Sequence, residues 1–336
     1  MTVVSVRDVA ERAGVSVGTV SNVMNHPEKV SASTVTRVRS AIHDLGFIRN
    51  DAARQLRDGR SKTIGLIVLD VRNPFFTDIA RGAEDQAAAA GLIVTLGNSD
   101  EDTARESTYL DLFEQQRVHG VLISPYADIT PRLLRLRQRG IPAVLVDRTS
   151  TDHSVSSVSV DDIAGGRLAV EHLISQGRHR IAYIGGPMEI RQVADRLDGA
   201  RLAVAVNPDV TLEVIRIEAL SVIAGRAAGA EILSRLPAHR PDAIFAANDL
   251  VAMGVLQALM MQGHGIAIPD QIALIGYDDI DFAAAAVVPL SSIRQPSALI
   301  GQTAVEILLA EAADPMIDPR QIVFQPELVV RASTRV

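Results

Sequence analysis

Two short runs near the start of the chain place apolar residues at helical spacing. Val6, Val9, Ala10 and Ala13 share one face of the first run, and Val20, Val23 and Met24 share one face of the second. Ser5 and Ser16 stand where the two helices begin and fit N-caps. Gly14 ends the first helix, because glycine tolerates a positive φ. The pattern predicts two short helices that are joined by a tight turn and packed through these apolar faces.

The second predicted helix turns small and polar side chains outward, and these are Val17, Gly18, Ser21, Asn22 and Asn25. Such side chains suit close approach to a base edge or a phosphate. A helical hairpin inside a larger domain would show the same short pattern, so the pattern alone leaves both interpretations open. The position of the pair ahead of a separate domain favours a helix-turn-helix, which lays its second helix in the major groove of DNA.

Charge is distributed unevenly along the chain. Residues 1–60 carry nine Lys and Arg against six Asp and Glu, a net charge of +3, whereas the whole chain carries −7, so the remainder carries −10. A basic head on an acidic body is expected when only one end of a protein meets phosphate. The asymmetry therefore supports DNA binding by the N-terminal segment.

From Thr63 onward, apolar runs of strand length alternate with amphipathic stretches of helix length. The predicted strands are Ile64–Leu69, Leu92–Gly97, Val121–Ser124, Ala143–Asp147, Ile181–Gly185, Ala243–Ala246 and Ile272–Tyr277. The predicted helices include Phe76–Ala90, Arg105–Arg117, Asp161–Gln176 and Asp249–Gln262. The strands are continuously apolar at their centres, which is typical of parallel strands that helices cover on both faces. The alternation predicts a doubly wound α/β fold, and about 270 residues suit two such lobes.

Composition narrows the class of protein. The 336 residues are 47% apolar and 22% charged, which is ordinary for a soluble globular protein of two or three domains. The chain shows no basic start followed by an apolar run, and its longest apolar candidate, Ala243–Met261, is interrupted by Asn248 and Asp249. We therefore expect a cytoplasmic protein without a membrane segment. The absence of cysteine excludes disulfides, thiolate metal sites and cysteine nucleophiles.

Hydrogen-bonding side chains follow the predicted strands where open α/β sheets bind ligands, outside the carboxyl ends of the strands. The candidate cleft residues are Asn73, Phe75, Phe76, Asp147, Arg148, Arg196, Asn248, Asp278 and Gln295. Aspartate, asparagine, arginine and glutamine each hold two hydrogen bonds in fixed directions, which matches sugar hydroxyls. Phe75 and Phe76 offer flat apolar faces to the C–H face of a sugar ring, and only 3% of the chain is aromatic.

Single members of this set have simpler explanations. Asn248 fits a helix cap, and Asn73-Pro74 fits a turn. The set as a whole, placed at the ends of successive strands, favours a binding cleft.

The run Val6–Asn25 resembles the DNA-binding head of the lactose-repressor (LacI/GalR) family of bacterial transcription regulators. Val30-Ser31 with Ala32–Leu45 resembles the third helix of that head, and Asn50–Arg57 resembles its hinge helix. The similarity continues to the C-terminus and covers almost the whole chain. It implies a helix-turn-helix domain at 1–48, a hinge helix and linker at 49–62, and a two-lobed effector-binding and dimerisation core at 63–336. That core would have the fold of periplasmic sugar-binding proteins, with three segments crossing between the lobes.

The resemblance also implies which residues meet DNA. Val17, Gly18 and Asn22 would read bases, and Leu56 would wedge into a minor-groove step once two hinge helices fold together on DNA. The full implied set is Ser5, Ser16, Val17, Gly18, Thr19, Ser21, Asn22, Asn25, Asn50, Ala53 and Leu56. The chain departs from the family at Asn22, where arginine is frequent, and at Arg49, where proline is frequent. Asparagine pairs with adenine rather than guanine, so we expect an altered operator half-site.

The nine cleft residues match, in order and in flanking sequence, the cleft pattern of ribose-binding proteins and ribose-type repressors. The match implies a sugar effector, ribose or another aldopentose, with a nucleoside as the alternative. Two chains would pair through their cores and hold two heads on a near-palindromic operator. Sugar-sensing relatives are usually released by ligand, so we expect induction. No leucine heptads follow Arg331-Ala332-Ser333, so we expect a homodimer rather than a tetramer.

Two other function classes fit the sequence less well. Asp147 and Asp278 could be imagined as a glycosidase pair, but Arg148 beside Asp147 suggests a carboxylate held ionised for binding. The sequence offers no Gly-rich nucleotide loop, no metal-ligand cluster among its eight histidines and no nucleophile elbow. We therefore expect no enzymatic activity, no cofactor and no bound metal. A sugar-binding transport protein would need a secretory signal and would have no use for the N-terminal helix pair.

Overall fold

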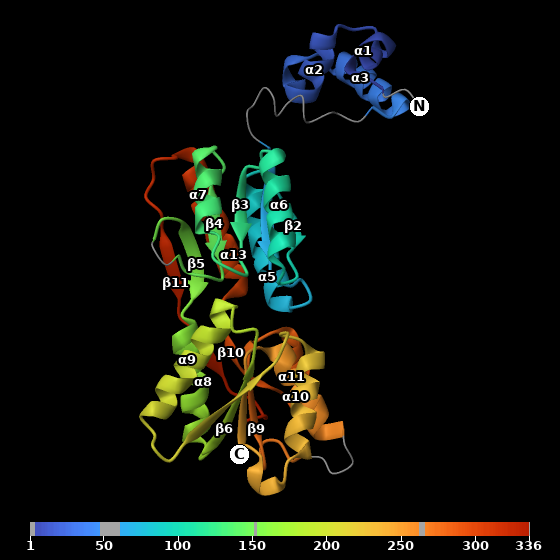
Figure 1. Ribbon diagram of the computed structural model, residues 1–336. Helices are drawn as coiled ribbons and strands as arrows, with labels where there is room; N and C mark the ends of the chain where they lie inside the picture. Colours follow the sequence, from blue (N-terminus) through green and yellow to red (C-terminus); the bar gives the residue numbers. More distant parts are fainter. Residues whose placement is uncertain (1–3, 48–60, 151–152, 262–265, 336) are drawn as a thin grey trace. The chain divides into compact units, whose positions relative to one another are not determined.

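The computed structural model describes residues 4–47, 61–150, 153–261 and 266–335 (Figure 1). Backbone contacts divide the chain into two compact units, Met1–Arg60 and Ser61–Val336. The predicted hinge residues Asn50, Ala53 and Leu56 lie outside the described residues.

Within residues 4–47, the N-terminal unit contains the α-helices α1 (Val6–Ala13), α2 (Val17–Asn25) and α3 (Ala32–Leu45), and a short 3-10 helix at Pro27–Lys29. Ser5 caps α1 in a capping box, because its hydroxyl accepts from the Asp8 backbone N–H while the Asp8 carboxylate accepts from the Ser5 N–H at 2.7 Å. Gly14 ends α1 with a φ of 62°, and Ser16 caps α2 by accepting from the Thr19 N–H at 3.1 Å. The predicted helix pair and its caps are confirmed.

The three helices bury one small apolar core. It consists of Val9, Ala10, Ala13, Val20, Val23, Val38 and Ala41, with Met24 packed against it. The outward and inward faces therefore follow the 3.6-residue period of the sequence.

The second unit holds two six-stranded sheets, one in each of two lobes (Figure 1). The first sheet has the order β11 (Gln321–Phe324), β5 (Ser156–Val160), β4 (Ala143–Val146), β3 (Gly120–Ile123), β1 (Thr63–Val68) and β2 (Ile93–Asn98). The second has the order β12 (Glu327–Val329), β10 (Ser291–Arg294), β9 (Ala273–Asp278), β8 (Ala243–Ala246), β6 (Arg180–Gly185) and β7 (Thr211–Arg216). Neighbouring strands are parallel except β10 and β12. The doubly wound α/β prediction is confirmed.

Helices cover the sheets of both lobes. The first lobe carries α5 (Pro74–Ala89), α6 (Thr103–Gln115), α7 (Thr130–Gln138) and α13 (Ser297–Ala313). The second carries α8 (Asp162–Ser175), α9 (Arg191–Ala205), α10 (Val222–Ser234), α11 (Asp249–Met261), the short α12 (Asp281–Ala285) and a 3-10 turn at Pro237–His239. Glycine lets some helices approach closely: a Cβ on Gly82 of α5 would lie 2.0 Å from the Ala298 carbonyl oxygen of α13.

Three segments cross between the lobes, as the sequence resemblance implied. The chain passes from β5 to α8 at residues 160–162, from β10 to α13 at 294–297, and from β11 to β12 at 324–327. Because α13 packs on α5 in the first lobe, each lobe is built from discontinuous parts of the chain.

The strand predictions were right for the central strands of both sheets and missed strands toward the edges. The segment Leu92–Gly97 was expected to be buried on both faces, but β2 is an edge strand in which Ile93 is 64% exposed. Strand β5 was not predicted, because its Ser156-Ser157-Val158-Ser159-Val160 run is half polar yet buried. Strands β7, β11 and β12 were not predicted either, and they are only partly buried.

Candidate functional site

The exposed face of α2 carries the side chains predicted to meet DNA. Val17, Gly18, Asn22 and Asn25 are exposed, and Val17 retains 42% of its surface although it is apolar. The Asn22 side chain makes no hydrogen bond with any described residue, so both groups of its amide are available to a base edge. An exposed helix face with a free amide and a neighbouring glycine can approach a groove closely.

The other predicted residues of this face hold it together. Asn25 Nδ2 donates to Ser21 Oγ at 3.2 Å, and the Ser16 and Thr19 hydroxyls lie 2.9 Å apart. Ser5 is exposed at the start of α1, with its hydroxyl donating to Asp8 Oδ2 at 2.8 Å. These contacts fix the helix ends, and a surface hydroxyl such as that of Ser16 can donate to a phosphate oxygen.

A cavity in the second unit is lined by residues of both lobes. Its lining consists of Leu69, Asp70, Asn73, Phe75, Phe76, Glu101, Asp147, Ile190, Gln192, Val193, Arg196, Leu220, Asn248 and Asp278. Seven of the nine predicted cleft residues are in this lining, and all seven are at least nine-tenths buried. The prediction that ligand-binding residues follow the carboxyl ends of the strands therefore selected side chains that meet at one cavity, although they lie up to 205 residues apart in the chain.

Asn73 caps α5 and also bridges the lobes. Its Oδ1 accepts from the Phe75 backbone N–H at 3.1 Å, and its Nδ2 donates to Asp278 Oδ2 at 2.9 Å. Asp278 ends β9 of the other lobe. Asn73 therefore has both roles that the sequence allowed, because it caps a helix and also lines the cavity.

Asp278 is held from two sides. Gln295 does not line the cavity, but its Nε2 donates to Asp278 Oδ1 at 2.8 Å from behind. Burial raises the pKa of Asp278 to about 6, although Arg196 and the two amide donors pull it down. Asp278 also has a φ of 104°, a strained conformation that directs its carboxylate from the strand end.

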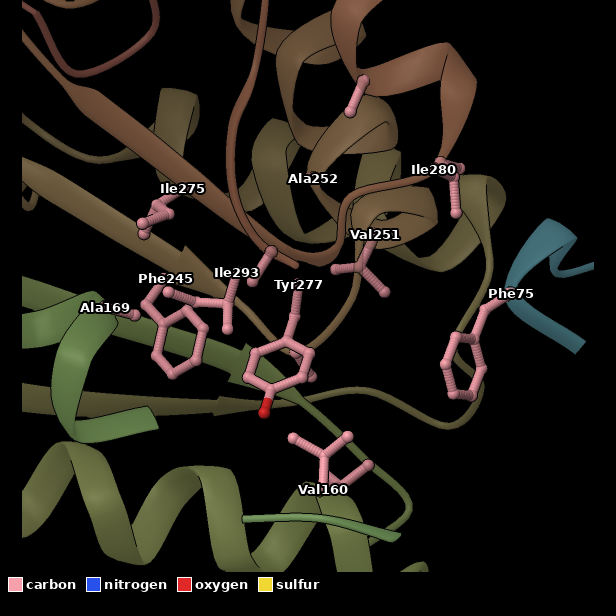
Figure 2. Close-up of a cluster of buried hydrophobic side chains, with 14 of the residues drawn as sticks. Phe75, Val160, Ala169, Phe245, Val251, Ala252, Ile275, Tyr277, Ile280 and Ile293 are labelled. Atoms are coloured by element: carbon pink, nitrogen blue, oxygen red, sulfur yellow. The ribbon is translucent and has the colours of Figure 1, made fainter. Parts of the chain in front are cut away.

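Arg196 is buried and fixed by three different interactions. Its Nε donates to Asp162 Oδ1 at 2.8 Å, and its Nη1 donates to the Ala247 carbonyl at 2.7 Å. Its guanidinium carbon lies 3.7 Å from the centre of the Tyr277 ring. Tyr277 itself sits among packed side chains that include Phe245 (Figure 2). Burial of this kind orients the arginine with little freedom, so its remaining edge faces the cavity and Asp278, whose Oδ1 is 3.9 Å from Nη2.

Asp147 is bound by Gln192 rather than by Arg148. Gln192, in the first turn of α9, donates through Nε2 to the Asp147 carbonyl at 2.6 Å and to Asp147 Oδ2 at 2.8 Å. This pair is a second bridge between the lobes. Burial raises the pKa of Asp147 well above its usual value, and the neighbouring Asp162 carboxylate adds to the rise. Arg148, which the sequence suggested as the partner of this carboxylate, donates to the Ala127 carbonyl instead.

Arg148 lies outside the cavity lining. Its Nη1 donates to the Ala127 carbonyl at 2.9 Å, so the guanidinium turns toward the loop after β3. Placement after a strand fixed the position of its backbone but not the direction of this long side chain.

The apolar part of the lining includes the predicted aromatic pair, together with Leu69, Ile190, Val193 and Leu220. The Phe75 and Phe76 rings meet edge to face, with centroids 5.2 Å apart, and both side chains are buried. Asn248 also lines the cavity, as the residue before α11, where its Oδ1 accepts from the Val251 N–H at 2.9 Å. An aromatic wall combined with amides and carboxylates is suited to a molecule with one apolar face and a polar edge.

Three polar members of the lining were not predicted from the sequence. Asp70 follows β1 and Glu101 follows β2. A search of every predicted strand end would therefore have added both residues to the candidate cleft. Gln192 gave no such signal, because it lies one turn into a helix and reaches a residue of the other lobe.

Two further features of the described residues bear on the class of site. Among residues 4–47, 61–150, 153–261 and 266–335, no three His, Asp or Glu side chains are grouped so that they could bind a metal. In the same part of the chain, no helix combines the length and hydrophobicity needed to cross a bilayer.

Comparison with known families and proteins gives a consistent result. The model of the bacterial regulatory proteins of the lacI family matches residues 5–50, and the periplasmic binding protein-like domain matches residues 170–334. The ribose operon repressor of Bacillus subtilis is 36% identical, with 91% of this chain and 90% of the relative covered. The transcriptional repressor PurR of Photobacterium profundum is 33% identical over 98% of both chains. Both of these relatives are repressors.

Solved structures agree with the sequence relatives. The Lac repressor dimer bound to operator and the anti-inducer ONPF is 27% identical with a TM-score of 0.83, and all of both chains is covered. A LacI family regulator from Enterococcus faecium with bound ribose is 29% identical with a TM-score of 0.72, covering 81% of this chain and 98% of that one. The helix-turn-helix, the two-sheet core and these matches together establish that the chain belongs to the lacI family of bacterial regulatory proteins and is a DNA-binding transcriptional regulator.

Proposed function

We propose that this protein is a repressor that binds a near-palindromic operator as a homodimer and releases it when a small sugar, ribose or another pentose, fills the cavity between its lobes. The observation that carries the proposal is the cavity itself, whose polar lining comes from both lobes of one chain. A ligand held there contacts both lobes at once. It therefore has a different affinity for different lobe arrangements, which is the condition for a ligand to shift an equilibrium.

The contacts of the cavity support a sugar. Asp147, Asp278 and Gln192 offer hydrogen-bond acceptors, whereas Arg196 and Asn248 offer donors, so hydroxyl groups that both donate and accept can pair with the wall. The edge-to-face pair of Phe75 and Phe76 offers the apolar surface that a sugar ring needs. The names of the relatives point the same way, because they include ribose operon repressors and regulators solved with bound ribose.

Effector binding would have to rearrange the bridges between the lobes. Asn73 and Gln192 each donate across the cavity, to Asp278 and Asp147 respectively. A ligand hydroxyl that takes the place of either partner changes how the lobes are tied together. This gives a physical route from the cavity to the first lobe, to which the operator-reading unit is connected in sequence.

On the DNA side, Val17, Gly18 and Asn22 would contact base edges, and the remaining residues of the exposed face would contact phosphate. The proposal keeps the domain limits of 1–48, 49–62 and 63–336, and it keeps Asn50, Ala53 and Leu56 of the hinge as minor-groove contacts. Asn22 with its free amide would select adenine.

The homodimer would use apolar surface that one chain leaves open. Ile93 is 64%, Ile223 74%, Met261 73% and Val287 85% exposed. Apolar residues exposed to this extent favour an interface, and a second copy of the chain supplies the second DNA head that a palindrome requires. As a regulator that acts on DNA, the protein would work in the cytoplasm and without catalytic activity.

Selection from random DNA duplexes tests the proposal directly. The purified protein is used to select duplexes with no ligand, then with ribose, with other pentoses and with nucleosides. A selected palindrome that ribose or another pentose releases supports the proposal. Release by a nucleoside alone would replace the pentose with the alternative effector, and failure to select any sequence would overturn the assignment of the reading helix.

A further inference from the structure

The cavity has more hydrogen-bond acceptors than donors. Asp147 Oδ1 and Gln192 Oε1 are both buried, and neither has a hydrogen-bond partner among the described residues. Both side chains line the cavity, and both are already fixed by the bond between Gln192 Nε2 and Asp147 Oδ2. Buried acceptors without partners are costly, so a ligand that donates to them gains more than one that does not.

Two more carboxylates line the same cavity in the first lobe. Asp70 accepts from Arg72 Nε at 2.9 Å, and the second carboxylate is that of Glu101. Glu101 has no hydrogen bond or ion pair through its side chain with any described residue. Its backbone is fixed at a φ of 58°, and its N–H donates to the Leu69 carbonyl at 3.2 Å. Glu101 is thus an acid that interacts with the nearby Arg72 through charge alone, without a hydrogen bond to any described residue, and its backbone is held at the cavity by a turn.

The charges of the lining do not balance. Apart from Asp147, whose pKa burial raises well above its usual value, the lining holds three carboxyl groups, those of Asp70, Glu101 and Asp278, and one cation, Arg196. The guanidinium of Arg196 is already bound to Asp162, which lies outside the lining. An added anion would therefore meet an excess of negative charge in a place that water screens poorly.

Helix N-termini favour anions, and three helices, α5, α9 and α11, begin at this cavity. Side chains cap the ends of α5 and α11, whereas no side chain caps the end of α9. The Phe75 N–H at the start of α5 bonds to Asn73, and the Val251 N–H at the start of α11 bonds to Asn248. These donors are not free for a phosphate, although free N–H groups are what make helix ends bind phosphate.

We infer that the cavity selects an unphosphorylated ligand rich in hydrogen-bond donors and rejects its phosphorylated counterpart, with Glu101 as a specificity-determining residue. The inference rests on the proposed function and narrows its ligand class. It distinguishes a regulator that senses the free sugar or nucleoside from one that senses the product of a kinase.

Calorimetric titration of the full-length protein with matched pairs tests this inference. The pairs are ribose with ribose 5-phosphate, and inosine with inosine 5′-monophosphate. The titrations are run at pH 8, because burial raises the pKa of Glu101 to about 7. In the pair that binds, the neutral member is expected to bind at least about 10-fold more tightly.

The variant Glu101→Gln keeps the shape of the side chain and removes its charge. It should reduce the preference for the neutral member by about 3- to 10-fold, since one partly solvated charge is lost. Glu306→Gln is the matched control, because Glu306 is exposed on α13 and outside the lining. It should leave the preference unchanged.

The outcomes separate the inference from the proposed function. A phosphorylated member that binds as tightly as its neutral partner overturns the inference and leaves a ligand-gated repressor standing. The same holds if Glu101→Gln changes the preference no more than Glu306→Gln does. If none of the four compounds binds, the proposed effector class fails and the inference fails with it.

Discussion

Asn73 and Asp278, which are 205 residues apart in the chain, share a buried hydrogen bond of 2.9 Å that joins the two lobes across the cavity. Asn73 is at the same time the cap of α5, and Asp278 is at the same time bound by Gln295. Each residue is therefore fixed within its own lobe before it reaches the other. A ligand that competes for Asp278 acts on a rigid contact, so its binding is transmitted to the lobes instead of being absorbed by side-chain motion.

Replacement of Asp278 by asparagine should separate effector response from operator binding. Asparagine fits the positive φ at this position but lacks the second acceptor oxygen and the charge, so effector affinity should fall by about 10- to 100-fold. Operator affinity without ligand should stay within about 3-fold, because the reading unit is separate. Fluorescence anisotropy with labelled operator, titrated with ribose, measures both quantities. The control is Asp281→Asn, which changes a nearby exposed carboxylate. If the Asp278→Asn protein responds to ribose as the wild type does, Asp278 is not part of the effector site.

The raised pKa of Asp278 predicts a dependence of stability on pH. The carboxyl has a pKa of about 6 in the folded protein against 3.8 as its ordinary value, so the folded state binds more protons between these two values. Its contribution therefore favours folding at low pH and is lost as the pH rises from about 4 through 6, by at most about 3 kcal/mol. Urea unfolding followed by circular dichroism, at several pH values, gives the total dependence. Subtracting the curve of Asp278→Asn isolates this residue, and two parallel curves would contradict the prediction.

Much of the fold follows from the sequence because buried strands are marked by uninterrupted apolar runs, as in Gly65-Leu66-Ile67-Val68. Strand β5 was missed because three of its five residues are serines that the fold buries, which no hydropathy pattern reveals. Ser156 donates to Glu311 and Ser157 donates to Gln321, whereas the Ser159 hydroxyl is buried without a partner among the described residues. Helix bounds were predicted best where a capping side chain marks them, as Ser5 and Ser16 do.

The candidate site could be predicted in position but not in direction. The carboxyl ends of parallel strands meet at one edge of each sheet, so Asn73 and Asp147 could be brought together from the strand pattern. Only the family resemblance, with its cleft between two lobes, brought Asp278 of the other sheet to them. Arg148 shows the limit, because a long side chain after a strand can turn to either side, and it turns to the Ala127 carbonyl. Gln192 shows another limit, because its partner in the other lobe depends on how the two sheets face each other.

Gly82 should be intolerant of a side chain. A Cβ at this position would lie 2.0 Å from the Ala298 carbonyl oxygen, and that backbone cannot move without shifting α13 against α5. We expect Gly82→Ala to lower the free energy of unfolding by about 1–3 kcal/mol, against the small gain that alanine usually gives within a helix. Thermal and urea unfolding measure the loss. Arg81→Ala, at the exposed neighbouring position, should change stability by no more than about 0.5 kcal/mol; equal effects of the two variants would show that the helix contact is looser than described.

Asn22 should set operator specificity at one base pair. Its amide is exposed and makes no hydrogen bond with any described residue, so it can pair bidentately with adenine. Asn22→Ala should lower the preference for the selected base by about 1–3 kcal/mol while the other positions of the half-site keep theirs. Repeating the duplex selection with the variant gives this result position by position. A uniform loss at every position would instead place Asn22 on a phosphate.

Gly18 offers a test in which stability and DNA binding should change in opposite directions. A Cβ at Gly18 would lie 3.6 Å from Ser16 Oγ, which is ordinary contact, so alanine fits α2 without strain. Because glycine within a helix is unfavourable by about 1 kcal/mol relative to alanine, Gly18→Ala should stabilise the N-terminal unit. If Gly18 faces a base edge or a phosphate at close range, the added methyl group should nevertheless weaken operator binding, by about 10-fold or more. The control is Ser40→Ala on the exposed surface of α3, which should stabilise the helix slightly and leave operator binding unchanged. A Gly18→Ala protein that is more stable and binds operator as tightly as wild type would place the contact face of α2 elsewhere, around Asn22 and Asn25 only.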